Sequence, residues 1–265
     1  MRRRINYSLF AGLKILVVLI VFSSCIPQKK IKYLQASHED STNRSEFVLA
    51  QFQEYHLSVG DNLYIKVRSL DENSNSFFNN MGNENRNTSY NDASVYLNSY
   101  TVDPGGNIVF PFIGPVPVLN KTVDETREII EEIMNEYLKE TTIIVKLVNY
   151  NITFIGEVRR PGEYKIYQDK INIFEAVSMA GDITDYGNRN EVKLMRTTDN
   201  GIALHILDLT KEDIIESPYY FLKPNDVIYV EPLKGKQFAF STFPYALIFS
   251  TITTLIVLLT FFNVK

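Results

Sequence analysis

Alternation of hydrophobic and polar positions predicts β-strands along most of the chain. Leu63, Ile65 and Val67 alternate with polar side chains directly after Gly60, which indicates a strand that follows a turn. Short alternating or β-branched runs of the same kind recur farther along. They occupy residues 141–148, 152–158, 163–166, 191–196, 202–207 and 227–230.

Two capping patterns predict the beginnings of two helices. In Thr122-x-x-Glu125, each side chain can accept a hydrogen bond from the backbone N–H of the other residue, and apolar side chains follow at helical spacing. Asn172, with Glu175 three positions later, predicts a second, shorter helix that ends at Gly181. Few helices among many strands predict an α+β fold class.

Glycine, proline and asparagine mark the turns between these strands. Residues 100–111 predict a hairpin in which Tyr100 and Val102 pair with Ile108 and Phe110. A further turn occurs twice, as Leu-x-x-Gly-Asp at 57–61 and as Leu-x-x-Asn-Asp at 222–226. Glycine and asparagine tolerate a left-handed backbone best, so we expect that conformation at the fourth residue of both turns.

Changes in pattern divide the chain into units. A polar stretch rich in asparagine and serine predicts a long surface loop inside the first folded unit. The predicted units are a signal peptide at 1–24, a polar tether at 25–46, a first domain at 47–150 with its loop at 71–94, a second domain at 151–232 and a transmembrane helix at 238–262.

The last of these stretches has no charged side chain between Lys236 and Lys265, and it is long enough to cross a bilayer as a helix. At helical spacing, small and hydroxylated residues fall on one side and aliphatic ones on the other. The first stripe holds Thr242, Ala246, Ser250, Thr253, Thr254, Val257 and Thr260, and the second holds Ile248, Ile252, Leu255, Leu259 and Phe262. Such a helix either packs against other helices or borders water on its hydroxylated side, or it is a plain membrane anchor.

The amino terminus has the organisation of a secretory signal. Three arginines precede an apolar run at 15–22, and small residues lead to Cys25. A lone cysteine directly after such a run resembles the lipobox of bacterial lipoproteins, which predicts acylation at Cys25. Phe22 stands where that motif usually has leucine, and the alternative is an uncleaved N-terminal anchor. Ile26 replaces the aspartate that often retains lipoproteins in the inner membrane, so this resemblance implies the outer membrane.

Charge and composition exclude several functions. Residues 1–24 hold four cationic side chains and no acidic one, so their removal changes the net charge from −4 to −8, which argues against a nucleic-acid partner. Cys25 is the single cysteine, so no disulfide can form within one chain. The three histidines are scattered, and no phosphate loop or zinc motif occurs. We therefore predict neither an enzyme nor a cofactor or metal site.

One charged cluster lies near a predicted turn, at Glu157, Arg159 and Arg160. It indicates either contact with sugar or a neighbouring subunit, or a solvated hairpin end, and the second reading is the more common for surface charges.

The order of motifs resembles the outer-membrane polysaccharide exporters of the Wza type. The pattern Tyr-x-Val-Asp-x-x-Gly-x-Ile-x-x-Pro-x-Ile-Gly at 100–114, between the turn at 57–61 and the helix start at Thr122, is similar to their export domain. The chain departs from it at 118–120, where a glycine is more usual. The phrases at 156–164 and 180–184 resemble the SLBB domain, a β-grasp-like module.

This resemblance implies a lipoprotein that exports capsular or extracellular polysaccharide. It implies a homo-oligomeric ring with its folded domains in the periplasm, one terminal helix from each copy in the outer membrane, and an inner-membrane polysaccharide co-polymerase or tyrosine kinase as partner. Two alternatives remain: an inner-membrane regulator of chain length with two flanking membrane segments, and a sugar-binding accessory protein without a pore.

Overall fold

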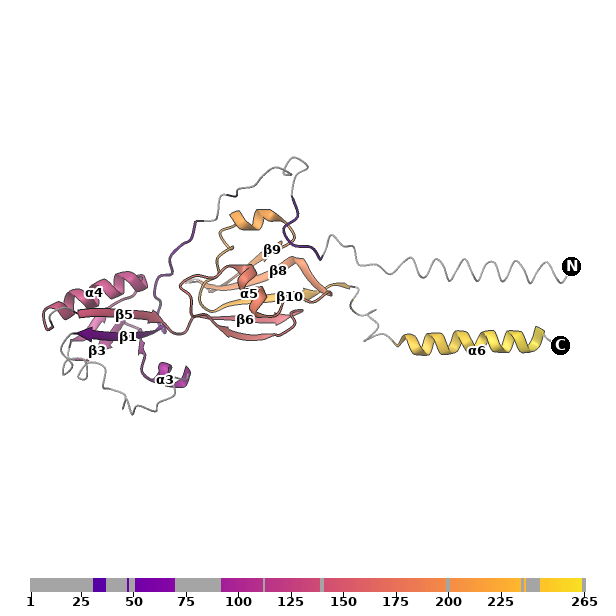
Figure 1. The fold of residues 1–265 in the computed structure, drawn as a ribbon, viewed down its shortest axis with the longest axis horizontal. Coiled ribbons are helices and arrows are strands. Elements are labelled where there is room, and N and C mark those ends of the chain that lie inside the picture. Colours follow the sequence, from indigo (N-terminus) through magenta and orange to yellow (C-terminus); the bar gives the residue numbers. More distant parts are fainter. Residues whose placement is uncertain are drawn as a thin grey trace.

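The computed structural model of the chain describes residues 31–36, 47, 51–69, 92–111, 113–138, 141–198, 201–234, 236 and 244–263. The described residues form helices together with two antiparallel sheets and one mixed sheet, which confirms the α+β class (Figure 1). The elements are β1 (Asn62–Ser69), α3 (Asp92–Leu97), β2 (Tyr100–Thr101), β3 (Asn107–Phe110), β4 (Gly114–Pro117), α4 (Val123–Asn135), β5 (Thr141–Leu147), β6 (Asn151–Gly156), β7 (Gly162–Lys165), α5 (Ile173–Met179), β8 (Gly187–Thr198), β9 (Gly201–Leu207), the 3-10 helix η3 (Glu212–Glu216), β10 (Asp226–Pro232) and α6 (Tyr245–Asn263).

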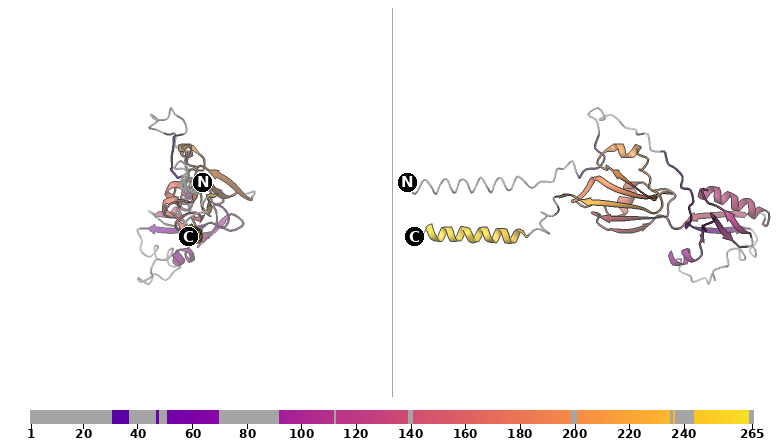
Figure 2. Two further views of the ribbon diagram at one scale, coloured as in Figure 1. Left: turned by 90° about the vertical axis from the view of Figure 1, so that its right-hand side faces the viewer. Right: turned by 180° about the vertical axis from the view of Figure 1, so that it is seen from behind.

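The first hydrophobic core lies between a small sheet and helix α4. The sheet has the strand order β2-β1-β5, and β1 and β5 pair antiparallel along seven residues from Leu63↔Leu147 to Ser69↔Thr141. Ile130 and Met134 of α4 are buried in this core. Figures 1 and 2 show α4 lying along β5.

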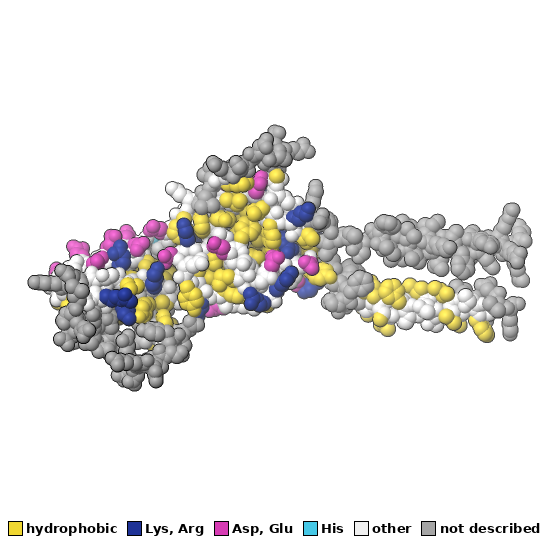
Figure 3. Space-filling model, viewed as in Figure 1, with side chains coloured by type: hydrophobic (Ala, Val, Ile, Leu, Met, Phe, Trp, Pro, Cys, Tyr) yellow, Lys and Arg dark blue, Asp and Glu magenta, His cyan; other side chains and the backbone are white. Residues whose placement is uncertain are grey.

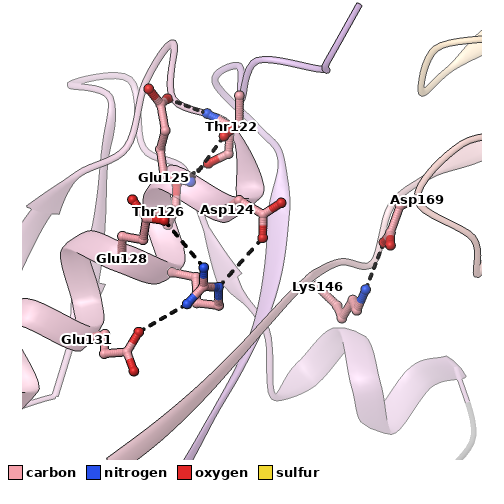
Figure 4. A network of polar contacts seen from close by, with 9 residues as sticks. Thr122, Asp124, Glu125, Thr126, Glu128, Glu131, Lys146 and Asp169 are labelled. Atoms are coloured by element: carbon pink, nitrogen blue, oxygen red, sulfur yellow. Dashed lines mark hydrogen bonds and ion pairs between the residues drawn. The ribbon is translucent and has the colours of Figure 1, made fainter. Parts of the chain in front are cut away.

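The predicted capping boxes of both helices are confirmed. At α4 the backbone N–H of Thr122 donates to Glu125 Oε2 over 2.9 Å, and the N–H of Glu125 donates to Thr122 Oγ1 over 3.1 Å (Figure 4). At α5 the same reciprocal pair joins Asn172 and Glu175. Each box satisfies two backbone donors that a helix start leaves without an intrahelical partner.

Two local predictions for the first unit were wrong. Ile108 and Phe110 pair with β4, not with residues 100–102, because Asn107–Phe110 and Gly114–Pro117 form their own two-stranded sheet, while Tyr100 pairs with Leu63 of β1. The predicted loop at 71–94 is shorter at its end, because α3 begins at Asp92. The rest of that loop lies outside the described residues.

The second core lies on one face of a five-stranded sheet with the order β7-β6-β10-β8-β9. Strand β10 pairs parallel with β6 and antiparallel with β8, so the sheet is mixed. The hairpin of β8 and β9 has Thr198 opposite Gly201, as the predicted two-residue turn requires. Helix α5 contributes Ile173, Ala176 and Val177 to the core.

The repeated turn takes the expected backbone at both places. Gly60 has a φ of 91° and Asn225 a φ of 64°, so each lies in the left-handed region, and this prediction is confirmed. In both turns the following aspartate is almost fully buried and accepts a hydrogen bond from the backbone N–H three residues before it, at Ser58 and at Lys223.

The two cores meet where β5 leads into β6. Leu147 contacts both cores. The side-chain amide of Asn149 donates to Asp61 Oδ1 over 3.1 Å, and its oxygen accepts from the backbone N–H of Asn62 over 3.1 Å. Lys146 also pairs with Asp169 at 2.7 Å (Figure 4), an exposed contact of little energetic weight.

The predicted transmembrane helix over residues 238–262 is not supported. Among the residues that the structure describes, no helix is both long and apolar enough to cross a membrane. Helix α6 begins at Tyr245 and has 19 residues, a rise of about 28 Å, against roughly 30 Å for a typical hydrocarbon core. Serine and threonine side chains within it also lower its hydropathy.

Candidate functional site

Helix α6 exposes many apolar side chains. Leu247, Phe249, Ile256 and Phe261 are exposed together with the predicted aliphatic stripe at Ile248, Ile252 and Leu255. Figure 3 shows this helix as a separate rod beside the second unit, with apolar side chains along it. The other residues that the structure describes leave this apolar surface uncovered, although a helix of such composition is usually buried.

The hydroxyl groups of α6 find their hydrogen-bond acceptors within the helix. Thr253 donates to the carbonyl of Phe249 over 2.7 Å, and Thr254 donates to that of Ser250 over 2.8 Å. Ser250, Thr251 and Thr260 donate to carbonyls three residues before them. Because these donors are already used, the hydroxylated side can lie in a dry helix contact as well as beside water.

The assignment of the two stripes to lumen and lipid stays a prediction. Thr242 lies outside the described residues, and the side chains of Leu259 and Phe262 are not described either. The other stripe residues of α6, Ser250, Thr253, Thr254, Thr260, Ile248, Ile252 and Leu255, are exposed in the single chain.

The predicted lipidation site, Cys25, lies outside the described residues, but part of the tether after it is ordered on the second unit. Gln35 forms a parallel bridge with Lys211, and its N–H donates to the carbonyl of Thr210 over 2.6 Å. Tyr33 packs edge-on against Phe174, with ring centroids 5.8 Å apart. Residues 31–36 therefore form a docked strap within the region predicted to be a polar tether.

Charged groups hold the strap at its tyrosine. The hydroxyl of Tyr33 donates to Asp182 Oδ1 over 2.5 Å, and the guanidinium of Arg189 lies 5.0 Å from the centre of the Tyr33 ring. Burial, and then the hydrogen bond to Asp182, raises the pKa of Tyr33 to about 12. The phenol therefore stays protonated and keeps its donor role at neutral pH.

The charged cluster near the β6–β7 turn separates into paired and exposed parts. Glu157 accepts hydrogen bonds from Lys236 and, over 2.8 Å, from Thr184. Arg160 donates to the carbonyl of Met179 over 2.9 Å. Arg159 and Arg160 are exposed. The turn thus has a structural carboxylate beside solvated arginines.

The described residues were predicted to hold no metal site, and their histidines have ordinary contacts. They contain no group of three or more histidine, cysteine, aspartate or glutamate side chains that could hold a metal ion. His205 stacks on Tyr219 with ring centroids 3.9 Å apart, and His56 is hydrogen-bonded to the carbonyl of Glu54. His38 lies outside the described residues.

Sequence reasoning missed the strap and the exposed face of the β8–β9 hairpin. The strap had a weak signal, because Ile31, Tyr33 and Leu34 are apolar positions within a largely polar stretch. The hairpin had a clearer signal, because Ile202, Leu204 and Ile206 alternate with a second set that ends in Leu207. The two sets must face different sides of the sheet, so apolar side chains fall on both.

Comparison with known proteins places a family domain on the first unit. Residues 49–148 match the family model described as polysaccharide biosynthesis/export protein. The chain is 31% identical over 104 residues to the EPS I polysaccharide export outer membrane protein EpsA of Ralstonia nicotianae, a match that covers 38% of this chain and 27% of that protein.

Two further relatives match over longer stretches. The exopolysaccharide production protein ExoF of Rhizobium meliloti is 29% identical over 147 residues, 53% of this chain and 32% of that protein. EpsA of Ralstonia solanacearum is 28% identical over 142 residues, 52% of this chain and 37% of that protein. The matched regions thus span between about a quarter and two fifths of these curated relatives.

Proposed function

Because residues 49–148 match the polysaccharide biosynthesis/export family model, we propose that the chain is a subunit of a translocon for capsular or extracellular polysaccharide. The match of the first unit to this family is the observation that carries the proposal. EpsA is named as an outer membrane export protein, which supports the outer membrane as the location of this protein as well.

The proposed mechanism is passive and requires several copies. A repeated head-to-tail contact closes a ring, and the ring encloses a periplasmic passage for the polymer. The second unit acts in this ring as an SLBB-type, β-grasp-like module. No bond of the polymer is made or broken, so the protein is not an enzyme.

Helix α6 is the proposed element of contact with the outer membrane. In the assembled ring, the α6 helices of neighbouring copies pack together, with Ser250, Thr253, Thr254 and Thr260 toward adjacent helices or the lumen. Ile248, Ile252 and Leu255 then face lipid. The uncovered apolar surface of α6 and its internally bonded hydroxyl groups support this arrangement.

Cys25 is the proposed site of acylation, which tethers each copy to the outer membrane while its folded units stay in the periplasm. An inner-membrane co-polymerase or its tyrosine kinase would feed polymer into the ring. The docked strap supports a short tether, because Tyr33 is held on the second unit only eight residues after Cys25, and eight residues reach at most about 28 Å.

Metabolic labelling with a palmitate analogue tests the anchor and the location together. We expect label on the wild-type chain and none on Cys25→Ala, with the wild type in the outer-membrane fraction. A chain-length regulator would instead carry no lipid and would fractionate with the inner membrane.

Deletion of the coding sequence tests the transport role. We expect surface polysaccharide to disappear and polymer to accumulate in the periplasm. Normal surface polysaccharide after deletion would contradict the proposal and favour a non-pore accessory role.

A further inference from the structure

The five-stranded sheet of the second unit has one face in the core and one face toward solvent. On β9 the solvent-facing residues are Ile202, Leu204 and Ile206, whereas Leu207 points into the core. Successive side chains of a strand point to opposite faces, so the register identifies the neighbours of these residues on the same outer face.

The register extends this apolar face across four strands. Leu204 lies opposite Met195 of β8, which lies opposite Val227 of β10. In the neighbouring row of the same face, Ile206 of β9 lies opposite Lys193 of β8. Lys193 lies opposite Tyr229 of β10, which lies opposite Ile155 of β6. The outer face of this sheet is therefore mainly apolar. Lys193 lies within it, between Ile206 and Tyr229, and its charge is paired with Glu231.

The three β9 side chains on this face are strongly exposed: Ile202 by 76%, Leu204 by 55% and Ile206 by 64%. Isolated exposed hydrophobic residues are ordinary on a protein surface, but a contiguous patch of this kind marks an interaction site. Among the residues that the structure describes, no element packs over this face; the 3-10 helix and α5 contribute to the core on the opposite side.

Strand β9 is also at the edge of its sheet, where the described strands leave one side without a ladder partner. Natural proteins usually protect such an edge with charges, proline or a very short strand. Strand β9 has seven residues, and its sequence Gly-Ile-Ala-Leu-His-Ile-Leu contains neither an acidic side chain nor lysine, arginine or proline. Both the edge and the face of β9 are thus suited to association with another polypeptide.

We propose that this outer face, centred on Leu204 and Ile206, is the surface by which one copy of the chain packs against the next copy in the ring. This inference rests on the proposed function, since a head-to-tail ring needs one defined surface on each copy to meet a different surface on its neighbour. Because the contact is heterologous, β9 of one copy meets a surface of the neighbour other than β9.

The size of the face fits the centre of such an interface. Four strands spaced by about 4.8 Å and five residues of about 3.3 Å each give roughly 300 Å² of flat sheet. A stable interface uses about 800 Å² of accessible surface on each partner, with an apolar centre and a polar rim. The apolar side chains of the face supply the centre, and the ion pair of Lys193 with Glu231 offsets the charge beside Ile206.

A double substitution, Leu204→Glu with Ile206→Glu, tests the interface in the full-length chain extracted in mild detergent. Both side chains are exposed, so the single chain keeps its fold, which circular dichroism checks. Removing the central residues of an interface weakens association by roughly 30-fold or more, the equivalent of at least about 2 kcal/mol. We expect mass photometry to show the wild type as an oligomer and the double variant as mostly single chains at the same concentration.

Val109→Glu is the matched control, because Val109 is 66% exposed but lies on β3 of the first unit. It receives the same new charge away from β9, and we expect it to keep the wild-type oligomer. A double variant that stays oligomeric and still exports polysaccharide would overturn this interface and leave the proposed function standing. A wild type that is a single chain in detergent and in lipid vesicles would overturn both.

A photo-crosslinking amino acid at Leu204 identifies the occupant in cells. An adduct of two copies, joined from position 204 to a peptide outside the outer sheet face, supports the proposal. A link between position 204 of both copies would indicate a two-fold pair, and a link to α6 of the same chain or to another protein would indicate a different occupant. Each of these latter results would overturn the proposal.

Discussion

The same five-residue turn occurs in both units of this protein, and its two copies compensate a buried carboxylate in different ways. Asp61 follows Gly60 in the first unit and Asp226 follows Asn225 in the second, and the two aspartates are 3% and 1% exposed. Each accepts a hydrogen bond from the backbone N–H three residues earlier, over 2.8 Å and 2.7 Å. The backbone of the turn is therefore the same.

The side chains around the two carboxylates are not the same. Asp61 accepts from the hydroxyl of Tyr55 over 2.9 Å and from the amide of Asn149, both neutral. Asp226 accepts from Arg196 through two parallel bonds of 2.9 Å and 2.7 Å. The local sequence thus determines the turn. Residues distant in the sequence determine whether its buried carboxylate is hydrogen-bonded to neutral groups or paired with a cation.

Removal of the arginine is expected to have the largest effect. Arg196→Met keeps an apolar stem but leaves Asp226 as an unpaired buried charge, so we expect a loss of about 3–5 kcal/mol in the unfolding free energy. Chemical denaturation followed by circular dichroism measures it. Adding Asp226→Asn to Arg196→Met should recover part of the loss; a double variant as unstable as the single one would show that the ion pair is not the cause.

Loss of the first carboxylate is expected to cost less. Asp61→Ala leaves the Tyr55 hydroxyl and the Asn149 amide without their acceptor, and we expect a loss of roughly 2 kcal/mol. Burial, and then the charge of Asp61, raises the pKa of Tyr55, so the hydroxyl remains a donor throughout the neutral range. The same denaturation assay checks the value. A loss as large as that of Arg196→Met would remove the distinction between the two turns.

Alanine at the left-handed positions should give a smaller and nearly equal loss in both turns. A Cβ at Gly60 meets no atom within 4 Å, so Gly60→Ala changes only the cost of the left-handed backbone. We expect this substitution to lower the unfolding free energy by about 1 kcal/mol. Asn225→Gly keeps the conformation accessible and should be nearly neutral, whereas Asn225→Ala should resemble Gly60→Ala. A destabilising Asn225→Gly would mean that the asparagine side chain, not its backbone, matters.

The smallest expected effect is a pH dependence at the β6–β7 turn. Burial opposes ionisation of Glu157, but hydrogen bonds from Lys236 and Thr184 outweigh it and lower its pKa below the ordinary 4.5. A lowered pKa in the folded state stabilises the fold above the unfolded pKa, and that gain is lost as pH falls through the folded value. The melting temperature of wild type should therefore exceed that of Glu157→Gln at pH 7, and the difference should shrink below about pH 4.5.

Glu163→Gln serves as the control for this series, because Glu163 is exposed on strand β7. It should leave the melting temperature close to that of wild type across the same pH range. A difference for Glu157→Gln that stays constant down to pH 3 would contradict the assigned role of its carboxylate.

Features that depend on neighbouring residues could be predicted from the sequence, and features that depend on distant ones could not. The capping boxes at Thr122 and Asn172 and the left-handed turns at Gly60 and Asn225 involve residues within five positions of each other, and all were confirmed. The predicted pairing of Tyr100 was wrong, because its backbone pairs with the more distant strand β1 and not with the strand nearest in sequence.

The same reason explains what was missed at the candidate site. Docking of Tyr33 depends on Asp182 and Arg189, about 150 residues away. The bare outer face at β9 depends on the order of strands in the sheet. The roles of Cys25 and of the α6 stripes stay predictions, since they concern a lipid and other copies of the chain.

Electron microscopy of the full-length protein, extracted from the outer membrane in mild detergent, tests the central claim most directly. A translocon built from several copies predicts closed rings with one constant subunit number and a central passage. A uniform population of single chains, or of two-fold pairs without a passage, would contradict the account.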